Sequence, residues 1–183
     1  YSNLGAILKD LGKLEEAEVA IRKAIHIAPD LVIAHLHLSS LLMDQGKLEE
    51  AEVSIRTAIE INPDRGEIYI NLGSILRNLG KLEEAELSAR KGVELCSDLP
   101  IAHVNLGGVL RYLGKLQEAE VYILKGLELD PESASAYANL GLLYYDLGRY
   151  KEAEDYLRKA IRLDPENGQF HQSLSHLLLR CKR

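Results

Sequence analysis

The sequence contains little of what several protein classes require. Tryptophan is absent, phenylalanine occurs once, and Cys96 and Cys181 are the only thiols among 183 residues. Two cysteines so far apart do not form a disulfide scaffold, so a reducing compartment is expected. No apolar run approaches the roughly 20 residues of a membrane-spanning helix, and no signal-peptide pattern is present. These absences predict a cytoplasmic protein without membrane insertion.

Positive charge is also scarce. The chain has 22 lysines and arginines against 28 aspartates and glutamates, which gives a formal net charge of -6. Nucleic-acid-binding proteins concentrate cations to displace counterions, so nucleic acid is not an expected partner. Abundant leucine, alanine, glutamate and lysine with only five prolines instead favour an all-helical chain.

A short segment recurs along the chain at a constant period. The sequence GKLEEAE and its variants begin every 34 residues, at Gly12, Gly46, Gly80, Gly114 and Gly148. A fixed period of this length indicates stacked structural repeats. The sequence therefore predicts a single array over 1–183, with units at approximately 1–29, 30–63, 64–97, 98–131 and 132–165 and a closing helix in 166–183.

Two helical patterns occupy each unit. In the third unit, apolar residues from Tyr69 to Leu79 recur at helical spacing and stop at Gly80, which can adopt the left-handed conformation that closes a helix. A second pattern starts at Leu82. The acidic residues that follow Pro29, Pro63, Pro131 and Pro165 are expected to cap the next helix. Predicted helices cover 1–11, 14–27, 31–45, 48–61, 65–79, 82–95, 99–113, 116–129, 133–147, 150–163 and 167–180.

This pattern resembles the tetratricopeptide repeat (TPR) over essentially the whole chain. The motif has a large residue, leucine and a small residue in its first helix and alanine in its second, here Tyr69, Leu72, Gly73 and Ala85. The resemblance implies an all-α fold, a right-handed α-α superhelix (TPR solenoid) of five helix pairs plus a C-terminal helix. It also implies a protein-binding scaffold.

One junction departs from the pattern. The proline position of the third unit holds Ser97, proline appears instead at Pro100, and Gly92 lies inside the preceding helix. Because glycine in a helix interior costs about 1 kcal/mol relative to alanine, a hinge is predicted near residues 89–100.

No catalytic or metal-binding constellation is apparent. The paired glutamates of each repeat point about 100° apart on a helix, so they do not oppose one another as acid and base. His35, His103 and His171 take the position that Tyr1, Tyr69 and Tyr137 hold elsewhere and are expected to pack between helices. Zinc-ligand, nucleophile-elbow and phosphate-loop motifs are missing. We therefore predict no enzymatic activity, no cofactor and no metal.

Function is expected on the face formed by the first helices. One position there carries Asn3, His37, Asn71, Asn105 and Asn139. An amide both donates and accepts hydrogen bonds, so a row of them can pair with a peptide backbone at roughly every third residue. Alternatively, these asparagines bond neighbouring backbone. The row resembles the asparagine ladder in the TPR superhelix of O-linked N-acetylglucosamine transferases, which implies capture of an extended polypeptide.

Other residues of the same helices complete the predicted groove. Leu36, Ile70 and Val104 are expected to form an apolar strip, and Arg77 and Arg111 a cationic patch. The two-lysine pattern of TPR carboxylate clamps is missing, which disfavours a chaperone-tail adaptor. Three functions stay open: peptide capture on the concave face, self-assembly through the apolar C-terminal helix at Leu174–Leu179, and a substrate-docking arm of a larger transferase.

Overall fold

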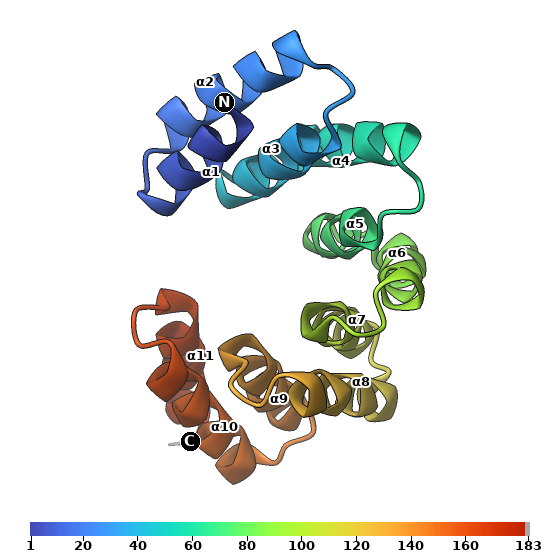
Figure 1. The fold of residues 1–183 in the computed structure, drawn as a ribbon. Helices are drawn as coiled ribbons and strands as arrows, with labels where there is room; N and C mark the ends of the chain where they lie inside the picture. Colours follow the sequence, from blue (N-terminus) through green and yellow to red (C-terminus); the bar gives the residue numbers. More distant parts are fainter. Residues whose placement is uncertain (182–183) are drawn as a thin grey trace. The chain divides into compact units, whose positions relative to one another are not determined.

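A computed structural model describes residues 1–181 of the chain. Within this range the backbone forms eleven α-helices and no strand, as predicted (Figure 1). The chain divides into two compact units, residues 1–95 and 96–183, and each is described here by itself. The single array and its superhelical hand stay predictions, and Lys182 and Arg183 of the predicted closing segment lie outside the described residues.

The first unit holds three helix pairs. Its helices are α1 (Ser2–Asp10), α2 (Leu14–Ile27), α3 (Val32–Asp44), α4 (Leu48–Ile61), α5 (Gly66–Asn78) and α6 (Leu82–Leu95). The first helices of the pairs contact one another, α1 with α3 and α3 with α5. Each of α2 and α4 packs on its own first helix and on the next one.

The second unit repeats this arrangement with two pairs and an eleventh helix. Its helices are α7 (Pro100–Tyr112), α8 (Leu116–Leu129), α9 (Ala134–Asp146), α10 (Tyr150–Leu163) and α11 (Gly168–Cys181). Here α9 contacts α7, α8, α10 and α11. All eleven predicted helices are present, with boundaries within two residues of the predicted ones.

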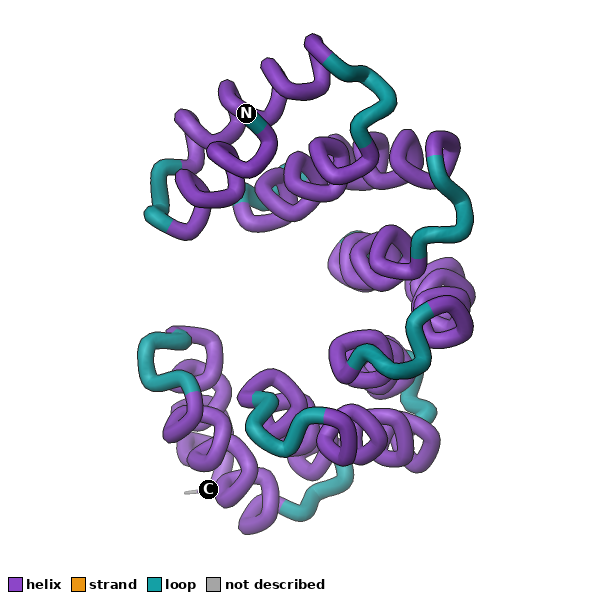
Figure 2. The backbone as a smooth tube through the Cα atoms, in the orientation of Figure 1, coloured by secondary structure: helices purple, strands orange, loops and turns teal. Residues whose placement is uncertain are grey.

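Glycine ends the first helix of every pair, as the sequence predicts. Gly80 has φ of 75°, its N–H donates to the Arg77 carbonyl, and the Lys81 N–H donates to the Leu76 carbonyl. This is the Schellman arrangement that satisfies the last carbonyls of a helix. The same conformation recurs at Gly12, Gly46, Gly114 and Gly148. It produces the short turns inside each pair (Figure 2).

Small residues let the two helices of a pair approach closely. In α7 a Cβ on Gly107 would lie 2.5 Å from Cγ1 of Ile123 in α8, and in α9 a Cβ on Gly141 would lie 2.6 Å from Cγ of Leu157 in α10. Gly92 serves the same purpose in a second helix, because its missing side chain leaves room for Ile70. The glycine that was expected to weaken α6 is therefore a packing position.

The predicted acidic caps are wrong. Helices α3, α5 and α9 have Leu31, Arg65 and Ser133 at their N-caps, one residue beyond the acidic position. Only Ser133 of these three accepts a hydrogen bond through its side chain, from the Ala136 N–H at 3.4 Å. In these three turns the N-cap is the second residue after the proline, and the acidic residue is the first.

The boundary between the two units falls at the unusual junction. Leu95 ends α6, and α7 begins at Pro100, where the missing N–H costs no helical hydrogen bond. The boundary therefore lies inside the segment 89–100 in which a hinge was predicted. The hinge itself stays a prediction.

Candidate functional site

The predicted ladder residues all lie on first helices. Asn3 is exposed on α1, and the other four members are half-buried on α3, α5, α7 and α9. They are His37, Asn71, Asn105 and Asn139. Each unit therefore carries its own part of the row, and we consider the two parts separately.

Several members of the row bond the protein itself. Asn139 Nδ2 donates to the Ser135 carbonyl of its own helix at 2.9 Å. His37 Nδ1 lies 2.9 Å from Ser2 Oγ and 3.2 Å from the Ser2 carbonyl, and burial lowers the pKa of the imidazole. The side chain of Asn71, in contrast, makes no hydrogen bond to another described residue. Asn139 and His37 therefore bond neighbouring backbone, which was the alternative to ligand binding.

The predicted apolar strip lies in the core. Leu36, Ile70 and Val104 are nearly fully buried. A Cβ on Gly92 would lie 2.9 Å from Ile70 Cγ1, and one on Gly126 would lie 2.5 Å from Val104 Cγ2, so both side chains pack against a second helix. We expected these three side chains to face a ligand. That expectation is wrong, because almost none of their surface is accessible to a ligand.

The predicted cationic patch is neutralised at one of its two members. Arg111 Nη1 pairs with Asp146 of the next first helix at 2.6 Å, and only 12% of its side chain is exposed. Arg77 Nη2 lies 3.4 Å from Oδ1 of the adjacent Asn78. Arg111 is therefore a link between successive first helices and not a free cation.

This link has a regular spacing of 35 residues. Lys9 pairs with Asp44 at 2.9 Å in the first unit, as Arg111 does with Asp146 in the second. Ser2 meets His37, and Arg180 donates to the Tyr145 hydroxyl at 2.8 Å, with the same separation. A residue of one first helix thus bonds the residue one position further in the next repeat.

A cleft of about 650 Å³ opens on the first helices of the second unit. Arg111 of α7, Tyr145 and Asp146 of α9, and Gln172 and His176 of α11 line it. Tyr145 and His176 lie with ring centroids 5.6 Å apart. Sequence reasoning did not find this cleft, although Tyr145 holds the repeat position of Arg77 and Arg111.

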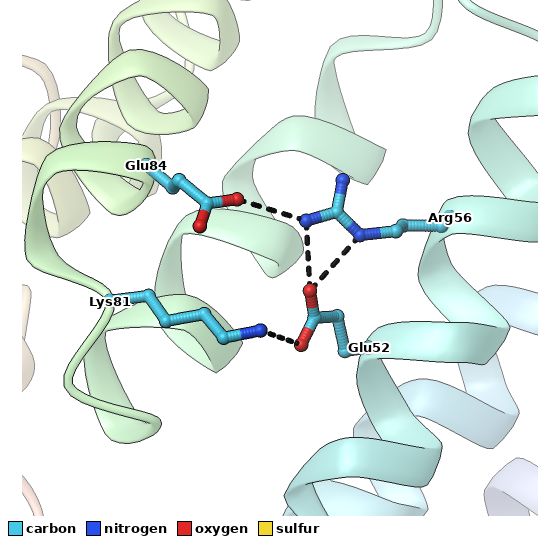
Figure 3. A network of polar contacts seen from close by, with 4 residues as sticks. All are labelled: Glu52, Arg56, Lys81 and Glu84. Carbon is cyan, nitrogen blue, oxygen red and sulfur yellow. Dashed lines mark hydrogen bonds and ion pairs between the residues drawn. The ribbon is translucent and has the colours of Figure 1, made fainter.

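Second helices carry an ion-pair network that sequence reasoning also missed. Glu52 accepts from Arg56 of its own helix and from Lys81 of the next repeat, both at 2.8 Å. Arg56 also reaches Glu84 at 3.1 Å (Figure 3). One repeat earlier, Glu18, Arg22, Lys47 and Glu50 make the same contacts. The sequence signal was the constant spacing of 28 and 29 residues between these charges.

The network predicts an acid-sensitive contribution to stability. Hydrogen bonds from Lys47 and then Arg22 lower the pKa of Glu18 from 4.5 to about 2. A carboxyl whose pKa falls on folding stabilises the fold above its unfolded pKa, and that stabilisation disappears as the pH falls toward the folded pKa. Glu18→Gln should therefore cost about 1 kcal/mol or less at neutral pH, and this cost should shrink toward zero as the pH falls to about 2 and below.

Urea unfolding of wild type and Glu18→Gln over this pH range measures the difference. Glu15→Gln is the matched control, since Glu15 is exposed on the same helix and makes no ion pair with a described residue. A difference that stays constant with pH would contradict the assignment.

His35 and His103 are buried, as expected, whereas His171 is exposed on α11 and does not pack between helices. Nε2 of His35, His103 and His171 lies 2.8 to 2.9 Å from the carbonyl oxygen six residues earlier, in the turn between repeats. Tyr137 donates its hydroxyl to the Pro131 carbonyl in the same way, at 3.2 Å. A carbonyl only accepts, so Nε2 of these histidines carries the proton. No three His, Cys, Asp or Glu side chains of residues 1–181 gather as metal ligands.

Comparison with known proteins identifies the repeats. Three models described as tetratricopeptide repeat match the chain, at residues 1–31 and 32–65, at 55–86, and at 98–166. Together they cover all but residues 87–97 and 167–183, and the first of these gaps contains Gly92 and Ser97 of the unusual junction. No curated protein sequence matches the chain.

Solved structures with the same fold support this identification. The chain is similar to a protein of the APC/C hetero-tetramer Cut9–Hcn1, with 22% identity and a TM-score of 0.88 over 100% of this chain. It spans 36% of that protein's length. TTC0263, a thermophilic TPR protein in Thermus thermophilus, has 22% identity and a TM-score of 0.84, covering 97% of this chain and 96% of that one.

YrrB, described as a TPR protein with an unusual peptide-binding site, has 25% identity and a TM-score of 0.63, covering 96% of this chain and 89% of that one.

None of the helices in the described part of the chain is long and apolar enough to cross a membrane. The repeat period, the paired helices and the matching models together show that the chain belongs to the tetratricopeptide-repeat family.

Proposed function

We propose that the chain is a non-catalytic scaffold of the cytoplasm that binds an extended segment of a partner protein on its first helices. The observation that carries this proposal is the cleft on α7, α9 and α11. The proposal includes neither a cofactor nor nucleic acid as a ligand. It concerns each unit by itself, because each presents its own first helices.

The lining of the cleft suits a peptide backbone. Gln169 and Gln172 bring amides that donate and accept, and Ser173 and Tyr145 bring hydroxyl groups. Leu142 and Leu179 add apolar surface for side chains of the segment. An extended peptide presents N–H and C=O groups alternately along its length, so mixed donors and acceptors favour it irrespective of its sequence.

The asparagine row has a narrower role than the sequence predicts. Asn71 keeps both its donor and its acceptor for a ligand in the first unit. Asn139 uses one N–H of Nδ2 within its own helix, so its second N–H and its Oδ1 remain for a ligand. We therefore propose that Asn71 binds the partner's backbone in the first unit, and that Tyr145 and Gln172 dominate in the second.

A library of random 12-residue peptides displayed on phage, selected against the full chain, tests this proposal. Selected peptides should bind Tyr145→Ala/Gln172→Ala or Asn71→Ala at least tenfold more weakly than wild type, which corresponds to about 1.4 kcal/mol. Glu60→Gln, at an exposed position of the second helix α4, is the matched control and should bind as wild type does. Equal affinity of all variants would contradict the proposal.

The two alternatives stay predictions. In the C-terminal helix Leu177 is buried, Leu174 and Leu178 are half-buried, and Leu179 is exposed. The apolar surface offered for self-assembly is therefore smaller than the sequence suggests. A role as the docking arm of a larger transferase uses the same first-helix face as peptide capture.

A further inference from the structure

The second helices carry an outward row of aliphatic side chains that the proposed groove does not use. Val19, Val53 and Leu87 occupy the same position in α2, α4 and α6, and they are 69%, 68% and 72% exposed. Val121 takes this position in α8 and is 65% exposed, whereas α10 has Asp155 there. Isolated exposed aliphatic residues are ordinary, but these three recur at one position of successive second helices.

This row points directly away from the first helices. Val19 lies two positions after Ala17, and therefore about 200° around the helix from a side chain that is fully buried. Val53 stands in the same relation to the fully buried Ala51. The row is thus on the outer side of the unit formed by residues 1–95, opposite the face proposed for peptide capture.

Carboxylates accompany the row one turn earlier. Glu15, Glu49 and Glu83 precede the three aliphatic residues by four positions, so they lie on the same side of each helix, and all are exposed. The basic residues nearby are already engaged: Arg22 and Arg56 each bridge two carboxylates, Lys91 pairs with Glu94, and Lys23 Nζ lies 4.5 Å from the Tyr1 ring centroid. The surface therefore consists of an apolar row beside an acidic row.

A pocket interrupts the surface between α2 and α4. It has a volume of about 510 Å³, Ile25, Leu38, Leu42 and Val53 contribute apolar lining, and the Arg22–Glu50 ion pair also lies in it. An aliphatic side chain from a partner can enter this pocket beside Val53. A partner side chain in this pocket would be buried, in addition to the contacts that the partner makes along the row.

We propose that this outer row, Val19, Val53 and Leu87, is a docking surface for a basic amphipathic helix of a partner protein. A helix fits better than an extended segment, because the middle turns of α2, α4 and α6 offer no free backbone groups to pair with a strand.

The charge of the surface selects the partner. The helices α2, α4 and α6 contain eleven acidic and five basic residues. A second copy of the same face would bring carboxylates together, whereas lysines or arginines along one flank of a partner helix would meet Glu15, Glu49 and Glu83. The occupant is therefore a basic helix and not a second copy of this chain.

A synthetic 21-residue helical peptide with leucines in a heptad seam and lysines along one flank is the probe. Isothermal titration against the full chain should show binding that weakens at least tenfold in Val19→Gln/Val53→Gln/Leu87→Gln. Because all three side chains are exposed, this variant should unfold at the wild-type temperature. Glu15→Gln/Glu49→Gln/Glu83→Gln should weaken binding and reduce its salt dependence.

Two control peptides and one control variant isolate the surface. Peptides with serine in place of leucine, or glutamate in place of lysine, should not bind, and Asn71→Ala/Tyr145→Ala should bind as wild type does. Equal affinity of wild type and the triple glutamine variant, or no binding of the leucine–lysine peptide, overturns the proposal. A dimer that the triple glutamine variant abolishes also overturns it, in favour of a second copy as occupant.

Discussion

Gly107→Ala is expected to destabilise the second unit by about 1–3 kcal/mol, the usual cost of overpacking a core. The added Cβ would lie 2.5 Å from Ile123 Cγ1, 3.0 Å from the Ala119 carbonyl oxygen and 3.2 Å from the Ile123 nitrogen. The isoleucine side chain can rotate, but the two backbone atoms belong to α8 and move only if the helices separate. The gain in helix propensity from glycine to alanine, about 1 kcal/mol, does not offset this.

Gly73 provides the matched control. It holds the same position in α5, but the opposing residue is Ala89, and a Cβ there would lie 3.3 Å from the nearest atoms. Gly73→Ala should therefore change stability by about 1 kcal/mol or less in either direction. Urea unfolding measures both variants, and hydrogen exchange assigns the loss to residues 96–183. Equal costs at the two positions would show that the opposing side chain is not the cause.

Ile55→Ala is expected to cost about 2–5 kcal/mol, whereas Val53→Ala on the same helix should change stability by about 0.5 kcal/mol or less. Ile55 is fully buried between α4 and its first helix, so its truncation loses apolar contact and leaves a cavity. Val53 is 68% exposed and faces outward, so its truncation removes almost no buried surface.

Thermal unfolding followed by circular dichroism measures this pair. Because each repeat contacts mainly its neighbours, the loss from Ile55→Ala should appear in the first unit and leave hydrogen exchange in residues 96–183 unchanged. A large cost for Val53→Ala would show that the outer row stabilises the fold, and would remove the reason to assign it to a partner.

The fold was largely predictable because its signals are local. The period of 34 residues, the glycine after each first helix and the helical spacing of apolar residues each depend on a few neighbouring positions. Gly80 illustrates this, since only glycine adopts its left-handed conformation without strain. The prediction of acidic N-caps was wrong, because the exact start of a helix depends on the length of the preceding turn, and a difference of one residue moves the N-cap past the acidic position.

The candidate site was less predictable because it depends on contacts between repeats. Ile70 precedes Asn71, and nothing in the local pattern shows that Gly92 makes room for Ile70 and buries it. Arg111 was expected to be free because its partner, Asp146, is 35 residues away. The sequence did contain the signal, since Asp44 and Asp146 stand 35 residues after Lys9 and Arg111, but a single helix does not show which residues meet.

The constant spacing of the ion pairs determines which changes in length the chain tolerates. Glu18 meets Lys47, and Lys81 holds the same position 34 residues later. If residues 47–80 were excised, Lys81 would follow Gly46 directly and take the place of Lys47, and Glu84 would take the place of Glu50 beside Arg22. A whole repeat can thus be removed or duplicated with its charges still paired. An insertion of any other length would change the spacing of the ion pairs that span it.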